Sequence, residues 1–218
     1  MSRHSFPAPE AIEAWPDFTT DQPLRILVSG CLAGNPVGYD GSTYGTYAHI
    51  ARLMSAPNVQ VTPFCPENFS FGTPRALCDI HGGDGFDVLA GHARVLTEEG
   101  EDWTDGMVIA AREMLRIARE SDVRFAILMD ISAACGSQVI YAGARPEAPY
   151  RVGQGVCAAL LSEAGIPVVS QRDLKTLKHI FEKIGCEFDF GRSPKDHHET
   201  DWYLTHLAQS AANERMSK

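Results

Sequence analysis

The fold is decided by the stretch Arg25-Ile-Leu-Val-Ser-Gly30, which is followed directly by Cys31. A short apolar run that ends at a glycine is typical of a buried strand leading into a loop. The loop runs from Cys31 to Ser42 and is rich in glycine. Cys31 is therefore expected to lie just beyond the carboxyl end of a buried strand.

Three later stretches repeat this pattern of a short apolar run. They are Val59-Gln-Val-Thr-Pro-Phe64, Phe125-Ala-Ile-Leu-Met129 and Pro167-Val-Val-Ser170, and each predicts a further buried strand. Apolar residues at helical spacing predict helices between the strands, and another helix follows the last one: residues 47–56, 103–120, 156–163 and 173–184. Strands that alternate with helices indicate an α/β fold with a mostly parallel sheet.

Two smaller features lie outside this alternation. Within residues 86–96, two short β-type runs flank Gly91 and predict a small hairpin, a β excursion from the main sheet. A peripheral helix near the C-terminus is predicted by apolar positions at helical spacing, Trp202, Leu204, Leu207 and Ala211. We therefore expect an N-terminal extension over residues 1–23, an α/β domain over 24–186 and a C-terminal helical extension over 187–218.

The composition excludes several classes of protein. Of the 218 residues, 44% are hydrophobic, and 19 Lys and Arg against 28 Asp and Glu give a net charge of −9. The chain is too apolar to be disordered, and no apolar run approaches the ~18 residues of a membrane span. Phosphate contacts need clustered Lys and Arg, which the sequence lacks, so nucleic acid is not an expected partner. The first 22 residues lack the apolar segment of a signal peptide, which predicts a cytoplasmic location.

Six cysteines in a cytoplasmic protein are expected to be thiols or metal ligands rather than disulfides. Three of them, Cys31, Cys65 and Cys135, each follow one of the first three predicted strands. Ligands of parallel α/β sheets bind beyond the carboxyl ends of the strands, so these thiols are predicted to meet there. Such thiols often pack as small apolar groups, but three thiolates also suit zinc or an iron–sulfur cluster and leave one coordination position open.

Six motifs occur in a fixed order between residues 24 and 170. They are Ile26-Leu-Val-Ser-Gly-Cys-Leu-Ala-Gly34, Tyr39-Asp-Gly41, Phe64-Cys-Pro-Glu67, Thr73-Pro-Arg75, Ala134-Cys-Gly136 and Gly153-Gln-Gly-Val-Cys-Ala-Ala-Leu-Leu161. Together they resemble the DUF523 family, which includes the thiouracil desulfurases. The resemblance implies a three-layer, Rossmann-like fold. It also implies, as in the desulfurases, a [4Fe–4S] cluster held by three cysteines, whose free iron takes sulfur from a thiolated base without net redox change.

The resemblance assigns roles to individual residues. Cys31, Cys65 and Cys135 match the cluster ligands, which makes them the cofactor-binding and metal-ligating residues. Glu67 matches an acidic position that is expected to activate a water or move a proton. Ser132 and Asp40 are expected to orient the base or the water.

Two departures from the family pattern lie in one loop. The chain has Ser132-Ala-Ala-Cys135 where the family usually has Ser-Pro-Ser-Cys, and Asp130 where this loop is usually basic. Such changes are expected to affect the identity of the substrate more than the binding of a cluster.

The resulting hypothesis is an iron–sulfur-dependent desulfurase that acts on a small thio-compound, with neither nucleic acid nor membrane as partner. An aerobic preparation is expected to lose the cluster or to carry zinc in its place. Two other hypotheses stay open at this point. One is a non-catalytic protein of the same fold that holds zinc or an iron–sulfur cluster, and the other is an α/β binding domain with inert thiols.

Other candidates have weaker signals. Cys157 lies on an apolar helix face and is predicted to be part of the core, Cys186 lies outside the resemblance, and Cys78 is a candidate fourth ligand. Gly153-Gln-Gly155 predicts either a tight entry into a helix or an anion site. The sequence His197-His198-Glu199 is not a zinc peptidase motif, because the second histidine of that motif would fall on a tryptophan.

Overall fold

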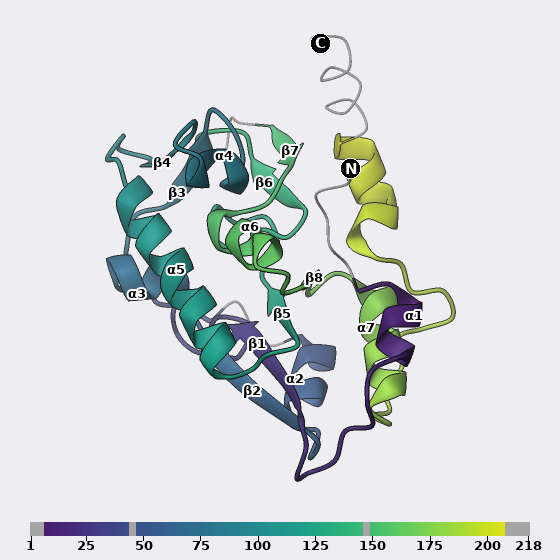
Figure 1. Ribbon diagram of the computed structural model, residues 1–218. Coiled ribbons are helices and arrows are strands. Elements are labelled where there is room, and N and C mark those ends of the chain that lie inside the picture. Colours follow the sequence, from purple (N-terminus) through teal and green to yellow (C-terminus); the bar gives the residue numbers. More distant parts are fainter. Residues whose placement is uncertain (1–6, 44–46, 146–148, 208–218) are drawn as a thin grey trace.

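The computed structural model describes residues 7–43, 47–145 and 149–207. Within these ranges the main sheet has four parallel strands in the order β2-β1-β5-β8 (Figure 1). They are β1 (Leu24–Ser29), β2 (Val59–Phe64), β5 (Phe125–Leu128) and β8 (Val168–Ser170). All four predicted strands are present, and the prediction of a mostly parallel α/β sheet is confirmed.

Helices cover both faces of this sheet, so that the domain has three layers (Figure 1). On one face lie α5 (Thr104–Glu120) and α6 (Val156–Glu163). On the other face lie α2 (Ala48–Met54), α7 (Leu174–Lys183) and the short α1 (Pro9–Glu13). The helices predicted between the strands are therefore confirmed, and α1 was not predicted.

Successive residues of β1 face opposite layers, as the two-residue period of a strand requires. Leu27 belongs to the apolar cluster beneath α5 and α6, whereas Ile26 and Val28 belong to the cluster beneath α2 and α7. All three side chains are fully buried. Burial on both faces explains why this strand has a continuous apolar run rather than an alternating pattern.

The small β excursion from the main sheet is confirmed, but the hairpin expected within residues 86–96 is wrong. Its first half forms a helix, α4 (Gly85–Leu89), because the Asp84 side chain accepts the amides that begin this helix and so forms a capping box. Gly91, at φ 78°, follows the last turn in the left-handed conformation that ends a helix. Its second half does form a strand, β4 (Arg94–Thr97), but this strand pairs with β3 (Cys78–His81), which the sequence did not predict.

A second pair of antiparallel strands consists of β6 (Val139–Tyr141) and β7 (Tyr150–Val152). It follows the loop at the end of β5. Within it Tyr141 pairs with Tyr150. This sheet places two tyrosine rings next to the edge of the main sheet where the cysteine loops lie.

The segment after α7, which the sequence predicts to be a C-terminal extension, contacts the loop after β5 through His197. After α7 the chain passes through a short 3-10 helix, η1 (His197–Glu199), to a helix over residues 201–207. This confirms the peripheral helix, although Leu204 is 54% exposed and does not belong to its buried face. Trp202 stacks on His197, and Ala211 lies outside the described residues. In the described part of the chain, no helix is long and apolar enough to cross a membrane.

Candidate functional site

A cavity of about 360 Å³ opens at the carboxyl ends of the three neighbouring strands β2, β1 and β5. Cys31, Cys65 and Cys135, which follow these strands, all line it. Glu67 and Ser132 line it as well. The structure thus brings together five of the six residues that the sequence and the family resemblance singled out, and leaves out Asp40.

Cys31 begins the loop after β1. The loop turns tightly, since the amide of Asn35 bonds back to the carbonyl of Gly30 at 3.0 Å. A Cβ at Gly30 would lie 3.1 Å from the Cβ of Cys65, a tight contact, so glycine at this position favours the close approach of the ends of β1 and β2. Burial, together with the charges of Cys65 and Glu67, raises the pKa of Cys31 to about 12.

Cys65 directly follows β2 and is the N-cap of a short helix, α3 (Pro66–Phe71), which the sequence did not predict. Its Sγ accepts a hydrogen bond from the amide of Asn68 at 3.4 Å. Burial raises the pKa of the Cys65 thiol, while this amide opposes the shift because it stabilises the thiolate.

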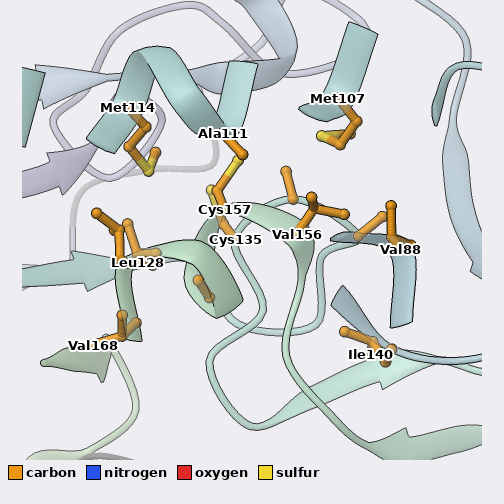
Figure 2. Packing of buried hydrophobic residues seen from close by; sticks show 14 of the residues in the cluster. Val88, Met107, Ala111, Met114, Leu128, Cys135, Ile140, Val156, Cys157 and Val168 are labelled. Atoms are coloured by element: carbon orange, nitrogen blue, oxygen red, sulfur yellow. The ribbon is translucent and has the colours of Figure 1, made fainter. Parts of the chain in front are cut away.

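Cys135 lies in the loop that connects β5 to β6 and is buried. Burial, followed by the neighbouring Cys157, raises its pKa, and a hydrogen bond from the Ser29 hydroxyl opposes that shift. Figure 2 shows Cys135 beside Cys157 in the apolar cluster beneath α5. Cys157 is thus a core residue, as predicted.

The loop around Cys135 is held by its own serine. Ser132 Oγ accepts the amides of Ala134 at 3.2 Å and Cys135 at 3.0 Å. Gly155, at the start of α6, lies directly against this loop, and a Cβ there would come within 2.6 Å of the Ala134 carbonyl. The Gly153-Gln-Gly155 motif therefore serves the tight packing of helix against loop.

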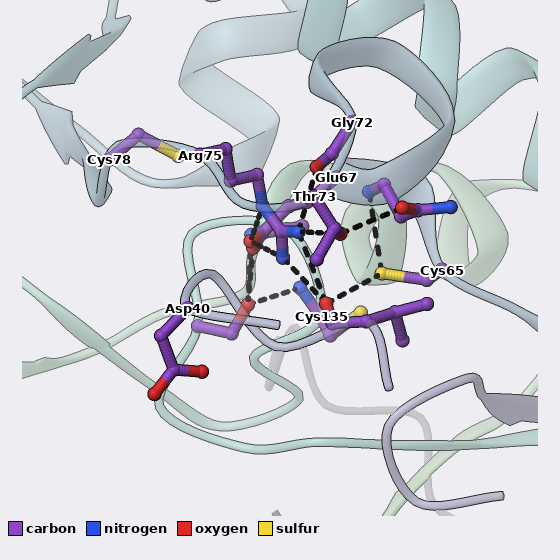
Figure 3. Close-up of polar contacts among 12 residues, drawn as sticks. Asp40, Cys65, Glu67, Gly72, Thr73, Arg75, Cys78 and Cys135 are labelled. Carbon is purple, nitrogen blue, oxygen red and sulfur yellow. Dashed lines mark hydrogen bonds and ion pairs between the residues drawn. The ribbon is translucent and has the colours of Figure 1, made fainter. Parts of the chain in front are cut away.

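Glu67 is fixed by an ion pair. Arg75 donates to its Oε2 through Nη2 at 2.8 Å and through Nε at 3.1 Å (Figure 3). The side chain of Arg75 is only 5% exposed and that of Glu67 is 22% exposed, so the pair is largely shielded from water. Burial alone would lower the pKa of Arg75, but the Glu67 charge raises it overall.

The other carboxylate oxygen of Glu67 faces the Cys135 loop. Ser132 Oγ donates to Glu67 Oε1 at 3.3 Å. Oε1 is thus held by one weak donor, whereas Oε2 is held by two donors of a guanidinium. Of the two oxygens, Oε1 is the one with capacity left to accept a proton or a hydrogen bond in the cavity.

Asp40 lies outside the cavity lining. Its Oδ1 accepts the amide of Ser42 at 2.9 Å, and the contact with Ser42 lowers the pKa of this exposed carboxyl. Figure 3 shows its carboxylate directed away from Glu67 and Arg75. A role for Asp40 in orienting a substrate stays a prediction, and the geometry offers a turn residue instead.

The sequence did not single out the aromatic part of the cavity. Tyr141 and Tyr150 line it, with their hydroxyl oxygens 3.4 Å apart. Arg145 lies 4.7 Å from the centre of the Tyr141 ring and forms an ion pair with Asp79 at 2.7 Å. The only sequence signal was a pair of tyrosines nine residues apart, which acquires meaning once β6 and β7 are paired.

Two further cysteines have different surroundings. Cys78, at the start of β3, is buried but also lines the cavity, and burial raises its pKa. Cys186 is buried in the cluster on the opposite face of the sheet. In the described part of the chain, no group of three or more His, Cys, Asp or Glu side chains is arranged to hold a metal ion.

Known proteins resemble this chain over the same region. The family model of 2-thiouracil desulfurase matches residues 26–173. The uncharacterized protein YbbK of Bacillus subtilis (strain 168) is 38% identical over 153 residues, which cover 70% of this chain and 99% of YbbK. Among solved structures, the [4Fe-4S]-dependent thiouracil desulfidase TudS (DUF523Vcz) matches with a TM-score of 0.61 and 34% identity, over 72% of this chain and 97% of TudS. By these matches, and with its cysteines at three adjacent strand ends, the chain belongs to the 2-thiouracil desulfurase family, DUF523.

Proposed function

We propose that this protein is a desulfurase that removes sulfur from a small thiolated base or a related thio-compound by means of a [4Fe–4S] cluster. The observation that carries the proposal is that Cys31, Cys65 and Cys135 line the same cavity as Glu67. Membership of the family and the likeness to a [4Fe-4S]-dependent desulfidase support the desulfurase role. The assignment of individual residues is our own.

The donor set fits such a cluster. Three thiols are soft ligands of the kind that iron–sulfur clusters use, and they leave one iron without a protein ligand. Burial raises the pKa of all three thiols, so positive charge is needed to hold them as thiolates, and iron supplies it. The amide of Asn68 and the hydroxyl of Ser29 each donate to one of the sulfurs, as is usual around a cluster.

The reaction to be catalysed is a hydrolysis. A C–O bond to water forms, the C–S bond breaks, sulfur leaves as sulfide, and no electrons are gained or lost overall. When bound, the cluster supplies an iron atom to which a sulfur atom can attach. The residues of the chain have to hold the ring of the substrate and to take a proton from the attacking water.

Glu67 is placed to take that proton. Its Oε2 is occupied by Arg75, which keeps the carboxylate in one orientation, while Oε1 is directed towards Ser132 and the cavity. The Ser132 hydroxyl accepts two loop amides and donates to Oε1, so its part is to hold this oxygen in place rather than to carry the proton. A positioned base of this kind accelerates a reaction by about 100-fold or more.

The tyrosines are placed to hold the ring. Tyr141 and Tyr150 line the same cavity as the three thiols, and aromatic side chains bind flat rings by stacking. The guanidinium of Arg145, which lies over Tyr141, restricts that ring on one side. The substrate class that fits is therefore a small planar thiocarbonyl compound.

Anaerobic reconstitution tests the proposal. We expect about one [4Fe–4S] cluster per chain and release of sulfide from 2-thiouracil or 4-thiouracil, with the oxygenated base as product. Cys31→Ser, Cys65→Ser and Cys135→Ser should each abolish the cluster chromophore. Cys186→Ser, a buried cysteine on the opposite face, is the matched control and should retain it.

Two results would overturn the proposal. A wild-type chain that takes up zinc alone, or no metal under anaerobic reconstitution, has no cluster site. A chain that carries the full cluster but releases no sulfide from any thiopyrimidine or related thioamide is a cluster-binding protein without this activity.

A further inference from the structure

The C-terminal extension contacts the base of the loop that holds Cys135, through His197 and Asp130. His197, which lies beyond residues 26–173 of the family match, places its Nδ1 2.5 Å from Oδ2 of Asp130. Both side chains are inaccessible, 2% exposed for His197 and 0% for Asp130. Asp130 lines the cavity of the three thiols, and His197 lines a second cavity.

Asp130 controls the shape of the loop. Its Oδ1 accepts the backbone amides at both ends of the loop, those of Ile131, Ser137, Gln138 and Val139, at 3.0–3.2 Å. Ser132 and Cys135 lie between these anchor points. Ile131 has φ 59°, a conformation that a β-branched residue adopts only when its surroundings impose it. One buried carboxylate therefore holds the loop in a strained conformation.

His197 is the donor to the other oxygen of this carboxylate. Burial alone would raise the pKa of Asp130, but the hydrogen bond and charge of His197 lower it, so the imidazole holds the carboxylate in its charged form. A buried charged acceptor that loses its donor is costly.

His197 is itself held in place by the tail and by α7. Its backbone amide donates to Asp173 at 3.0 Å, and the Trp202 ring stacks on the imidazole. Asp196, the preceding residue, accepts both the amide and the hydroxyl of Thr176 at 2.8 Å. The imidazole is thus fixed by contacts other than the one with Asp130, and Asp173 also accepts the side-chain amide of Gln138 at 2.7 Å.

We propose that His197 is a positioning residue of the cluster site, which acts through Asp130 to hold the loop of Ser132 and Cys135 in its cluster-binding shape. The inference rests on the cluster that the proposed function requires. It makes the C-terminal extension part of the site, although none of its described residues, 187–207, lines the cavity with the thiols.

The test compares three variants of the full chain. His197→Leu removes the donor to Asp130, and His197→Asn keeps an N–H near the position of Nδ1. Thr176→Val is the matched control, since it removes a hydrogen bond that anchors the same tail but leaves the contact between His197 and Asp130 intact.

The first measurement is the rate at which the reconstituted protein loses iron to a chelator. We expect about 10-fold faster loss from His197→Leu, the size of effect that follows when a buried charged acceptor loses its partner. His197→Asn should restore the slow rate, and Thr176→Val should not change it. The second measurement is the difference in melting temperature between the cluster-loaded and cluster-free forms. This difference should shrink only in His197→Leu, whereas a purely structural role would lower both temperatures equally.

A third measurement needs no cluster. In the cluster-free protein, the amides of Ser137, Gln138 and Val139 should exchange faster with solvent in His197→Leu than in wild type, and not in Thr176→Val. If His197→Leu does not fold, His197→Gln, whose amide does not reach the Nδ1 position, replaces it in all three measurements.

The outcomes separate this inference from the proposed function. A wild-type chain that binds no cluster overturns both. A wild-type chain that binds the cluster, with His197→Leu losing iron at the wild-type rate, overturns only the role of His197. Equal effects of His197→Leu and Thr176→Val also overturn it, because the tail would then act as general support.

Discussion

Replacing Glu67 by glutamine removes the base while keeping the size of the side chain. In the proposed mechanism Oε1 accepts a proton from water, and an amide oxygen cannot do so. The expected loss is about 100-fold or more in kcat, which corresponds to ~2.7 kcal/mol of transition-state stabilisation at 1.36 kcal/mol per tenfold. The cluster should still bind, because the three thiols are unchanged.

The same change has a structural cost that must be measured separately. Arg75, 5% exposed, loses its charged partner but keeps the carbonyls of Val37 and Gly72 as acceptors. We therefore expect a loss of about 1–3 kcal/mol in the free energy of unfolding, less than for a fully buried ion pair that loses one member. Urea denaturation of the cluster-free variant gives this value.

The assay is sulfide release per cluster under anaerobic conditions, with iron and sulfide content determined on the same sample. Glu113→Gln is the matched control, because Glu113 also pairs with an arginine, Arg116 at 2.7 Å, but lies on the surface of α5. It should leave activity per cluster unchanged. A fully loaded Glu67→Gln protein that turns over at the wild-type rate would refute the assignment of Glu67 as base.

Three further predictions concern the loop and its supports. Gly155→Ala places a Cβ 2.6 Å from the Ala134 carbonyl and should lower the free energy of unfolding by about 1–3 kcal/mol in urea denaturation; an unchanged midpoint would show that the helix can move away. Ser132→Ala removes the acceptor of two loop amides and the donor to Glu67, so cluster loss measured by absorbance should be faster, and an equal rate would mean that the loop holds without it. Burial raises the pKa of Asp173 from its ordinary 3.8 to about 7, so the unfolding free energy should fall by up to ~4 kcal/mol as pH rises from about 4 to about 7. Asp173→Asn should flatten this dependence, and an equally steep profile in the variant would assign it to another group.

The sequence predicts the main sheet well because its strands are buried on both faces. Runs such as Ile26 to Val28 leave no alternative to a core strand, and the helices between them have clear apolar stripes. Shorter helices and strands are predicted less well, because they have too few residues for a clear apolar pattern. Residues 86–89 have β-type side chains, yet the Asp84 capping box and Gly91 make them a helix, because local capping outweighs side-chain preference over so few residues.

Part of the candidate site could likewise be predicted from the sequence, and part could not. Cysteines placed after successive strands can be predicted to meet, because the carboxyl ends of parallel strands share one edge. Contacts that depend on the packing of distant segments cannot be read from spacing. Tyr141 and Tyr150 required the pairing of β6 with β7, and the contact of His197 with Asp130 spans 67 residues.

The three thiols belong to strands that are neighbours in the sheet but not all neighbours in the sequence, since β5 lies between β1 and β8 in space and more than sixty residues after β2 along the chain. A ribosome that has synthesised β1 and β2 has therefore delivered only two of the three ligands. The third arrives with the loop after β5, and His197, which is proposed to position that loop, follows 67 residues after Asp130. Iron and sulfide would accordingly bind after β5 and the segment that holds His197 have folded onto the first two strands, not while only Cys31 and Cys65 are in place.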